Sequence, residues 1–341
     1  MLVELGQAVT AEQAERLMAE VGADGGHLSP DNRRLVLLGD GVALRRERLV
    51  ESPLVRSFRP LEELPYPLAS RAFLPAGGIV SVGDQGVKIG VPGQPVIIAG
   101  PCSVESPDQI LETALAVARQ GAAILRGGAY KPRTSPHSFQ GFGCDAIKWL
   151  QEAGREAGLP TVSEVMDPRD VDTVASRVDM LQIGSRNMQN FALLAETARS
   201  GRPVMLKRGM WASVEEWLLA AEHLLAVGAA GVVLCERGVR SAATSGVPGT
   251  VGQGNTILDL NAVVAAKLET HLPVIVDPSH GAGYAPLVAP LARAGLAAGA
   301  DGIMVEVHPD PSQALSDGKQ SLTFEEFSRL VLACKQSTGG L

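Results

Sequence analysis

The stretch PVIIAGPCSVES, residues 95–106, joins a short apolar run to a loop of glycine, proline, cysteine and a carboxylate. The same pattern recurs toward the C-terminus, with an amphipathic helical stretch before each new apolar run. Eight alternating strand and helix units can be counted. This number favours an α/β fold of the closed (β/α)₈ TIM barrel type over an open doubly wound sheet. The expected strands lie near residues 96–99, 123–125, 161–165, 180–183, 204–206, 231–234, 274–276 and 302–305.

Chemically distinctive residues follow these strands. In a (β/α)₈ enzyme the loops after the strands form the catalytic face, so an active site predicts unusual residues there. The segments that enter the strands are plain, whereas each segment that leaves one is rich in charge, glycine or proline. In chain order these segments read GPCSVE, RGGAYKPRTSP, SEVMDP, GSRNMQN, KRGM, ERG, DPSHG and EVHPDP.

The chain has room for a second domain, because 341 residues exceed the roughly 250 that a barrel needs. We predict a small N-terminal α+β domain of the ferredoxin-like type at residues 1–75 and the barrel at residues 76–341. Thr10 and Gln13 form a capping-box pattern that opens an N-terminal helix, and Gly22 stops it. Flanking apolar runs complete a βαββαβ order. A hairpin at residues 80–91 is expected to cover the bottom of the barrel.

The composition excludes several classes of protein. A formal net charge of −7 argues against a dedicated nucleic-acid surface, which needs a basic excess. The N-terminus lacks the pattern of a signal peptide, and no apolar run is long enough to span a membrane, so we expect a cytoplasmic protein. The four cysteines have no short paired spacing, which argues against a zinc ribbon or a disulfide framework.

Basic residues gather in the loops after the strands although the protein is acidic. Taken singly each is an ordinary solvated charge, but several cations at one mouth repel one another unless anions bind there. Arginine suits carboxylate and phosphate in a bidentate manner, and lysine serves as a compact point charge. The sequence therefore predicts substrates with several negative charges. The residues are Arg126, Lys131, Arg133, Arg186, Lys207 and Arg237.

Four residues far apart in the chain form a candidate metal site: Cys102, His280, Glu306 and Asp317. Closure of the barrel brings the first, seventh and eighth strands side by side. A thiolate, an imidazole and two carboxylates suit a divalent ion of the Mn, Fe, Co or Zn class. Cys102 as a plain buried thiol is the alternative. Asp277 is expected to orient His280 or to serve as a turn carboxylate.

Two further residues are candidates for catalysis. His308 lies two positions after Glu306, so both are expected to face the barrel interior, where His308 is either a catalytic group or a satisfied core histidine. Glu164, at the end of the third strand, is a candidate general base or water-positioning group.

Taken together, these motifs resemble those of the 3-deoxy-D-arabino-heptulosonate 7-phosphate (DAHP) synthases, which open the shikimate pathway of aromatic amino acid biosynthesis. The match runs in order from about residue 95 to the end and is most similar to the short bacterial and archaeal branch. The resemblance implies a transferase that condenses phosphoenolpyruvate with erythrose 4-phosphate, releasing phosphate. It also implies a regulatory N-terminal domain that binds an aromatic amino acid, and a homotetramer. The motifs are GPCSVES, LRGGAYKPRTSPHSFQGFG, IGSRNMQN, LKRGM, LCERG, VDPSHG, VEVHPDP and ALSDGKQSL.

The resemblance also implies residue roles. Cys102, His280, Glu306 and Asp317 become the ligands of a metal that polarises the aldehyde. Lys131 becomes a proton donor to the new alkoxide, and Glu164 or the metal site handles the water. Phosphoenolpyruvate is expected on Arg126, Lys131, Arg186, Lys207 and Arg237, with backbone help from Ser185. Erythrose 4-phosphate is expected on Lys131, Pro132, Arg133, Thr134 and Ser135.

Two alternatives stay open. A 3-deoxy-D-manno-octulosonate 8-phosphate synthase uses a five-carbon sugar phosphate, and an asparagine-containing loop is typical of that group where this chain has KPRTS, residues 131–135. A barrel that senses an amino acid without catalysis is the second alternative. All four candidate metal ligands and the five cations expected to bind phosphoenolpyruvate are present, which argues against a loss of catalysis.

Overall fold

The computed structural model describes residues 1–132, 135–241 and 256–338. The chain divides into two compact units, one of Met1–Gly78 with Leu268–His271 and the other of Ile79–Lys267 with Leu272–Leu341. Across the described ranges, no helix combines the length and the apolar character that crossing a bilayer requires.

The first unit has the predicted ferredoxin-like topology. Its antiparallel sheet has the order β2-β3-β1-β4, which places the first strand between the third and the last. The predicted capping box opens the first helix, since the Thr10 side chain accepts from the Gln13 amide and Gln13 reciprocates. The elements are β1 (Leu2–Leu5), α1 (Ala11–Val21), β2 (Gly25–Leu28), β3 (Arg34–Leu38), α2 (Gly41–Leu44), α3 (Arg46–Glu51), β4 (Val55–Arg59) and η1 (Leu61–Glu63).

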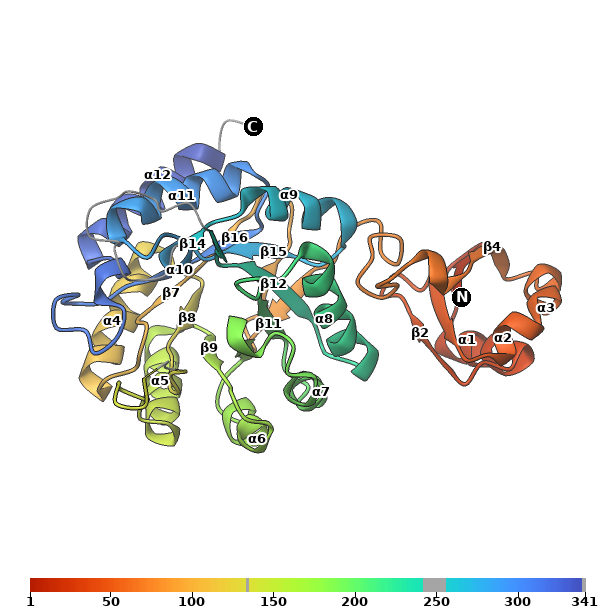
Figure 1. The fold of residues 1–341 in the computed structure, drawn as a ribbon, viewed down its shortest axis with the longest axis horizontal. Coiled ribbons are helices and arrows are strands. Elements are labelled where there is room, and N and C mark those ends of the chain that lie inside the picture. Colours follow the sequence, from red (N-terminus) through yellow and green to blue (C-terminus); the bar gives the residue numbers. More distant parts are fainter. Residues whose placement is uncertain (133–134, 242–255, 339–341) are drawn as a thin grey trace. The chain divides into compact units, whose positions relative to one another are not determined.

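The second unit contains the predicted closed barrel. Eight parallel strands pair in the order β7-β8-β9-β10-β11-β12-β15-β16, and β16 pairs with β7 to close the ring. Figure 1 shows these strands inside a ring of helices. The strands are β7 (Val96–Gly100), β8 (Ile124–Arg126), β9 (Thr161–Glu164), β10 (Met180–Ile183), β11 (Val204–Lys207), β12 (Val232–Glu236), β15 (Val274–Val276) and β16 (Gly302–Glu306).

Capping residues set the bounds of the surrounding helices. Ser106 caps one helix, and Ser213 with Glu216 forms a capping box for another. Glycines in the left-handed conformation end both. The helices are α4 (Pro107–Gln120), α5 (Cys144–Ala157), η2 (Pro168–Asp170), α6 (Val171–Ala175), η3 (Ser185–Asn187), α7 (Phe191–Arg199), α8 (Val214–Val227), α9 (Leu260–Glu269), α10 (Pro278–Ala282), α11 (Ala285–Ala297), η4 (Gly318–Gln320) and α12 (Phe324–Thr338). A small ribbon, β13 (Val239–Arg240) with β14 (Thr256–Ile257), follows β12.

A hairpin of β5 (Val80–Val82) and β6 (Val87–Ile89) covers the barrel bottom, as predicted. Val82 and Ile89 are fully buried in one cluster with the first residues of the barrel strands, such as Val96. This apolar contact closes the end of the barrel opposite to the loops that follow the strands.

The last residues of the first unit, 66–78, are hydrogen-bonded to the short segment Leu268–His271, which precedes β15. The amide of Arg71 donates to the carbonyl of Glu269 over 2.8 Å, and the amide of Gly78 donates to the carbonyl of His271 over 2.7 Å. The His271 ring in turn contacts the Leu68 carbonyl at 2.8 Å. These bonds explain why Leu268–His271 belongs to the first unit.

Truncation of the hairpin core should destabilise the barrel. We expect Ile89→Ala to lower the free energy of unfolding by about 2–5 kcal/mol, since it leaves a cavity in a closed cluster. The same change at the neighbouring Ile79, which is 54% exposed, should cost far less. Urea unfolding followed by circular dichroism measures both, and equal losses would contradict the role of the hairpin as a buried plug.

Candidate active site

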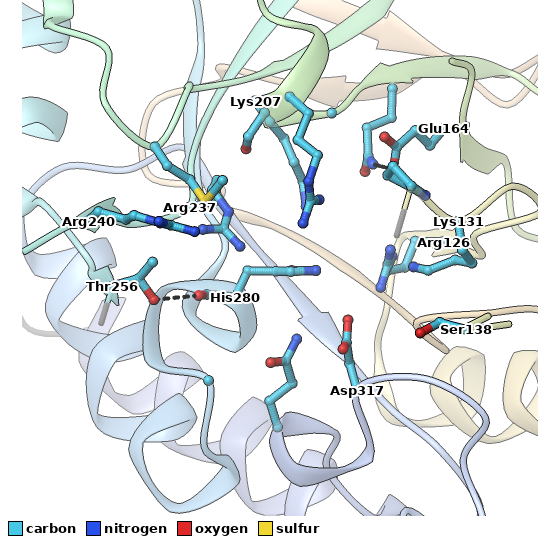
Figure 2. A pocket seen from close by; sticks show the side chains of 18 of the residues that line it. Arg126, Lys131, Ser138, Glu164, Lys207, Arg237, Arg240, Thr256, His280 and Asp317 are labelled. Carbon is cyan, nitrogen blue, oxygen red and sulfur yellow. Dashed lines mark hydrogen bonds between the residues drawn. The ribbon is translucent and has the colours of Figure 1, made fainter. Parts of the chain in front are cut away.

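A cavity of about 670 Å³ lies where the barrel strands end. Its lining is mainly polar and comes from the loops that follow the strands, as the sequence predicted (Figure 2). The lining residues are Arg126, Lys131, Pro132, Ser135, Ser138, Glu164, Gln182, Gly184, Ser185, Arg186, Lys207, Met210, Arg237, Arg240, Thr256, His280, Gly283, Asp317 and Gln320.

The predicted cations converge on this cavity. Arg126 and Lys207 are the last residues of β8 and β11, and both side chains are buried. Arg186 and Arg237 approach from the segments after β10 and β12. Figure 2 shows the labelled cations arranged around one space. Arg133 and Thr134 lie outside the described residues, so the contribution of the 131–135 segment is seen through Lys131, Pro132 and Ser135.

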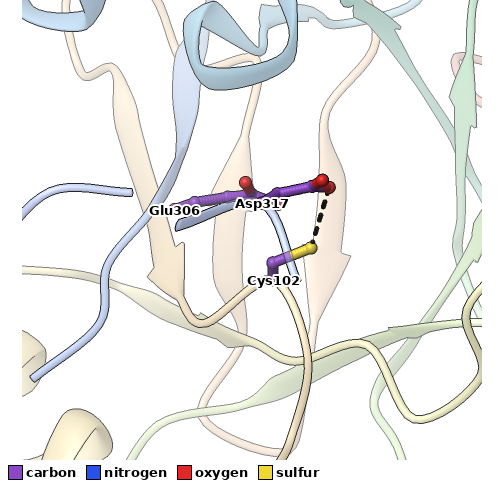
Figure 3. Close-up of side chains that lie close together, drawn as sticks. All are labelled: Cys102, Glu306 and Asp317. Carbon is purple, nitrogen blue, oxygen red and sulfur yellow. Dashed lines mark hydrogen bonds between the residues drawn. The ribbon is translucent and has the colours of Figure 1, made fainter. Parts of the chain in front are cut away.

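Three of the four predicted metal ligands come together. The donor atoms of Cys102, Glu306 and Asp317 all lie within 4.8 Å of one another (Figure 3). The Cys102 Sγ is 3.1 Å from Asp317 Oδ2. The fourth residue, His280, lies beside this group, with its Nε2 3.4 Å from Glu306 Oε1. Pairing of β16 with β7 places Glu306 opposite Gly100, and Cys102 follows two residues later.

Asp277 contacts the ring and the amide of His280, which fits both roles that the sequence left open for it. Its Oδ2 lies 2.6 Å from His280 Nδ1 and 2.6 Å from Lys207 Nζ, and its Oδ1 accepts the His280 amide. With Nδ1 engaged as a donor, the lone pair of Nε2 faces Glu306. Burial alone would raise the pKa of Asp277, but His280 and Lys207 hold it well below its usual range.

The charges in the ligand group suit a bound cation. Burial raises the pKa of the Cys102 thiol to about 12, and the nearby Glu306 carboxylate adds to this effect. Burial would also raise the pKa of Glu306, but His280 and Arg126 lower it to about 2. A divalent ion would displace the thiol proton and neutralise the carboxylates, and this donor set fits an ion of the Mn, Fe, Co or Zn class.

Lys131 connects the ligand group to the cavity. Its Nζ lies 2.9 Å from Cys102 Sγ and 3.1 Å from the Cys102 carbonyl. Burial would lower the pKa of Lys131, but the Cys102 sulfur and Glu306 outweigh this and raise it. The side chain is buried and still lines the cavity, so a cationic donor sits between the ligand group and the substrate space.

The two predicted catalytic groups lie in different places. Glu164 lines the cavity, where its Oε2 accepts from Gln182 over 3.2 Å. The structure does not bring His308 into the lining: it follows the end of β16, and its Nε2 faces Glu105 Oε2 at 3.4 Å. The expectation that Glu306 and His308 point to the same side assumed one continuous strand, but β16 ends at Glu306.

A buried ion network that sequence reasoning missed supports the segment carrying Arg237. Arg208 contacts Glu236 at 3.0 Å and Asp259 at 2.9 Å. The other oxygen of Glu236 accepts the Gly238 amide over 2.6 Å. These bonds fix both flanks of Arg237. Arg208 and Glu236 lie within the KRGM and ERG motifs, and their opposite charges were the feature of the sequence that could have indicated this ion pair.

Arg240 and Gln320 were also missed. Arg240 lines the cavity three residues after Arg237, and its guanidinium lies over the Trp211 ring at 5.7 Å. Gln320 donates to Glu306 Oε2 over 2.6 Å. Neither residue belongs to a barrel strand, so the alternation of side chains along a strand could not predict which way it points.

A (β/α)₈ barrel with a cation-lined cavity beside a thiol and carboxylate ligand group defines a class of enzymes that act on small anionic substrates. Residues 78–340 match the model of the DAHP synthetase I family. The chain therefore belongs to the DAHP synthetase I family.

Two similar proteins from Thermotoga maritima agree with this assignment, and a more distant relative has the name of another enzyme. The phospho-2-dehydro-3-deoxyheptonate aldolase of Thermotoga maritima is 46% identical over 322 residues, covering 92% of this chain and 90% of the relative. A crystal structure of the DAHP synthase of that organism matches with a TM-score of 0.75 at 41% identity, covering 98% of this chain and 96% of that chain. The 2-dehydro-3-deoxyphosphooctonate aldolase of Alkalilimnicola ehrlichii is 31% identical over 264 residues, covering 72% of this chain and 91% of the relative.

Removing the charge of Asp277 should disturb both the ligand group and Lys207. We expect Asp277→Asn to lower the affinity for a divalent ion by about 10-fold to 100-fold, since the neutral amide no longer offsets the charge of Lys207 and has only one oxygen for the three donors that now contact the carboxylate. Asp301→Asn is a matched control, because Asp301 bonds Lys267 at the barrel bottom. Chelator competition measures the affinities, and an equal loss in the control would contradict a specific role.

Proposed function

We propose that this protein is a DAHP synthase, which condenses phosphoenolpyruvate with erythrose 4-phosphate to give 3-deoxy-D-arabino-heptulosonate 7-phosphate and phosphate. The similarity to the Thermotoga maritima enzyme over 92% of the chain carries the proposal. The cavity supports it, because two phosphates and a carboxylate need several cations in one place. We also propose that the reaction serves aromatic amino acid biosynthesis in the cytoplasm.

The cations bind and orient the two substrates. Arg126, Lys207 and Arg237 suit the carboxylate and phosphate of phosphoenolpyruvate, together with Arg186 and the Ser185 backbone. The segment at residues 131–135 suits the phosphate of erythrose 4-phosphate. Because Arg126 and Lys207 are buried and already held by carboxylates, they can hold the reacting carbons close together and balance their charge without reorganisation.

The metal ligands would be Cys102, His280, Glu306 and Asp317. A divalent ion bound there supplies Lewis acidity toward the aldehyde oxygen. Lys131 is suited to deliver a proton to that oxygen, because its ammonium lies between Cys102 and the cavity. Glu164 lines the same cavity and is suited to position the water that attacks C2.

A second candidate function is 3-deoxy-D-manno-octulosonate 8-phosphate synthesis. It is favoured by relatives such as the Alkalilimnicola ehrlichii enzyme, which share 31% identity. The lower identity and the KPRTS sequence at residues 131–135 both favour the four-carbon sugar phosphate instead.

Substrate choice and metal dependence can be tested in one assay. We expect loss of the phosphoenolpyruvate absorbance with erythrose 4-phosphate and little with arabinose 5-phosphate. Complete chelation should abolish turnover, and adding back Mn²⁺ or Co²⁺ should restore it, because the aldehyde needs a Lewis acid. Turnover with the five-carbon sugar alone would favour the second candidate. Full activity after verified metal removal would refute the metal site.

We further propose that the first unit regulates the enzyme by binding an aromatic amino acid, and that the chain works as a homotetramer. A variant that begins at Ile79 should keep its activity but lose inhibition by phenylalanine or tyrosine. A truncated Thermotoga maritima enzyme matches this chain with a TM-score of 0.70 at 43% identity over 80% of this chain and 96% of that chain, which supports the design. Steady-state rates with each amino acid measure the effect. Equal inhibition of both proteins would contradict it.

A further inference from the structure

One carboxylate connects the loops that carry two of the metal ligands. Glu105 lies three residues after Cys102, and its Oε1 accepts the amide of Leu315 over 2.9 Å. Leu315 is two residues before Asp317. The other oxygen, Oε2, lies 3.4 Å from His308 Nε2. Glu105 therefore contacts both ends of the loop from residue 308 to 317.

Among the described residues, only one ring nitrogen of His308 has a hydrogen bond. The His308 Nδ1 accepts the Asp310 amide over 3.1 Å, so a neutral ring carries its proton on Nε2. This buried Nε2 lies 3.4 Å from Glu105 Oε2, close to the carboxylate but without the alignment of a hydrogen bond. The side chains of His308 and Glu105 are only 6% and 12% exposed, and shielding from water strengthens such a contact. We call Glu105, His308 and the Leu315 amide the Glu105 bridge.

A second contact runs parallel to the Glu105 bridge. The hydroxyl of Ser103 hydrogen-bonds the hydroxyl of Ser316, and both are buried. Ser103 is the neighbour of Cys102, and Ser316 is the neighbour of Asp317. The two ligands are thus tied through their adjacent residues as well as through their own Sγ to Oδ2 contact.

Asp317 needs such support because of its backbone. Its φ is +50°, in the left-handed region that residues other than glycine rarely adopt. A conformation of this kind persists when surrounding contacts hold it. The residues between His308 and Asp317 form no helix or strand that would do so. The contacts with the loop after β7 supply the constraint.

We propose that Glu105, oriented by His308, is a positioning residue that holds Asp317 in the metal-ligand group. It acts through the backbone of the loop and does not itself bind the ion. The inference rests on the proposed metal site. It also gives His308 a role outside the cavity, in place of a catalytic one.

The test measures metal affinity directly on the full-length protein freed of metal. Competition with a chromophoric chelator gives the affinity for Co²⁺ and Zn²⁺. We expect Glu105→Ala to weaken binding by about 10-fold or more. Glu105→Gln should give a smaller loss, because its amide oxygen can still accept from the Leu315 amide.

Asp179→Ala is the matched control. Asp179 also accepts a backbone amide from another segment, that of Thr161 over 2.8 Å, but at the opposite end of the barrel. We expect its metal affinity to stay within about twofold of the wild type. An unchanged affinity in Glu105→Ala, or an equal loss in Asp179→Ala, would overturn the inference.

A double-mutant cycle separates positioning from general destabilisation. If Glu105 acts through Asp317, adding Glu105→Ala to Asp317→Ala should cause no further loss of affinity. A further loss of about 10-fold would overturn the inference. Cys102→Ser tests the metal site itself. Wild-type metal affinity in Cys102→Ser would refute the proposed function. Weakened metal binding in Cys102→Ser together with normal binding in Glu105→Ala would refute only the role of Glu105.

Discussion

The site depends on the buried carboxylate of Asp277, which binds a lysine of the cavity and a histidine of the ligand group at the same time. An uncompensated charge at such depth is strongly unfavourable. Lys207 and His280, each 2.6 Å away, offset that cost. Their contact with one carboxylate fixes the spacing between Lys207 of the cavity and His280 of the candidate ligand group. A rigid spacing of this kind is what a reaction between two anionic partners requires.

The fold could be predicted from the sequence to a large extent, because the apolar runs of a parallel barrel are short, buried and separated by amphipathic helices. The strands at Met180–Ile183 and Val274–Val276 agree at both ends, and the others differ by a residue or two, as where Lys207 extends β11. The strand Gly25–Leu28 was not predicted, since the sequence GGHL has neither β-branched residues nor alternation. Leu268–His271 was not predicted as part of the first unit, since backbone hydrogen bonds leave no mark on the sequence.

The candidate site was predictable where a residue sits at or near a strand end. Arg126, Lys207 and Glu306 end strands, so barrel closure alone brings them together. His308 is buried but is not among the residues that line the cavity, because Val307 bridges to Leu322 and the chain leaves the strand there. Glu105 was not among the predicted site residues, because it follows a strand end by several positions. Its partners lie some two hundred residues away, and only coordinates show them.

The chain segment Leu268–His271 bears on how this protein could be recombined with others. The segment lies within the sequence of the barrel and yet belongs to the N-terminal unit, so a single cut in the chain does not separate the two units completely. A foreign N-terminal domain fused before the hairpin would leave the carbonyls of Glu269 and His271 without the amides of Arg71 and Gly78. A graft that keeps these two hydrogen bonds must therefore carry residues 66–78 along with the barrel.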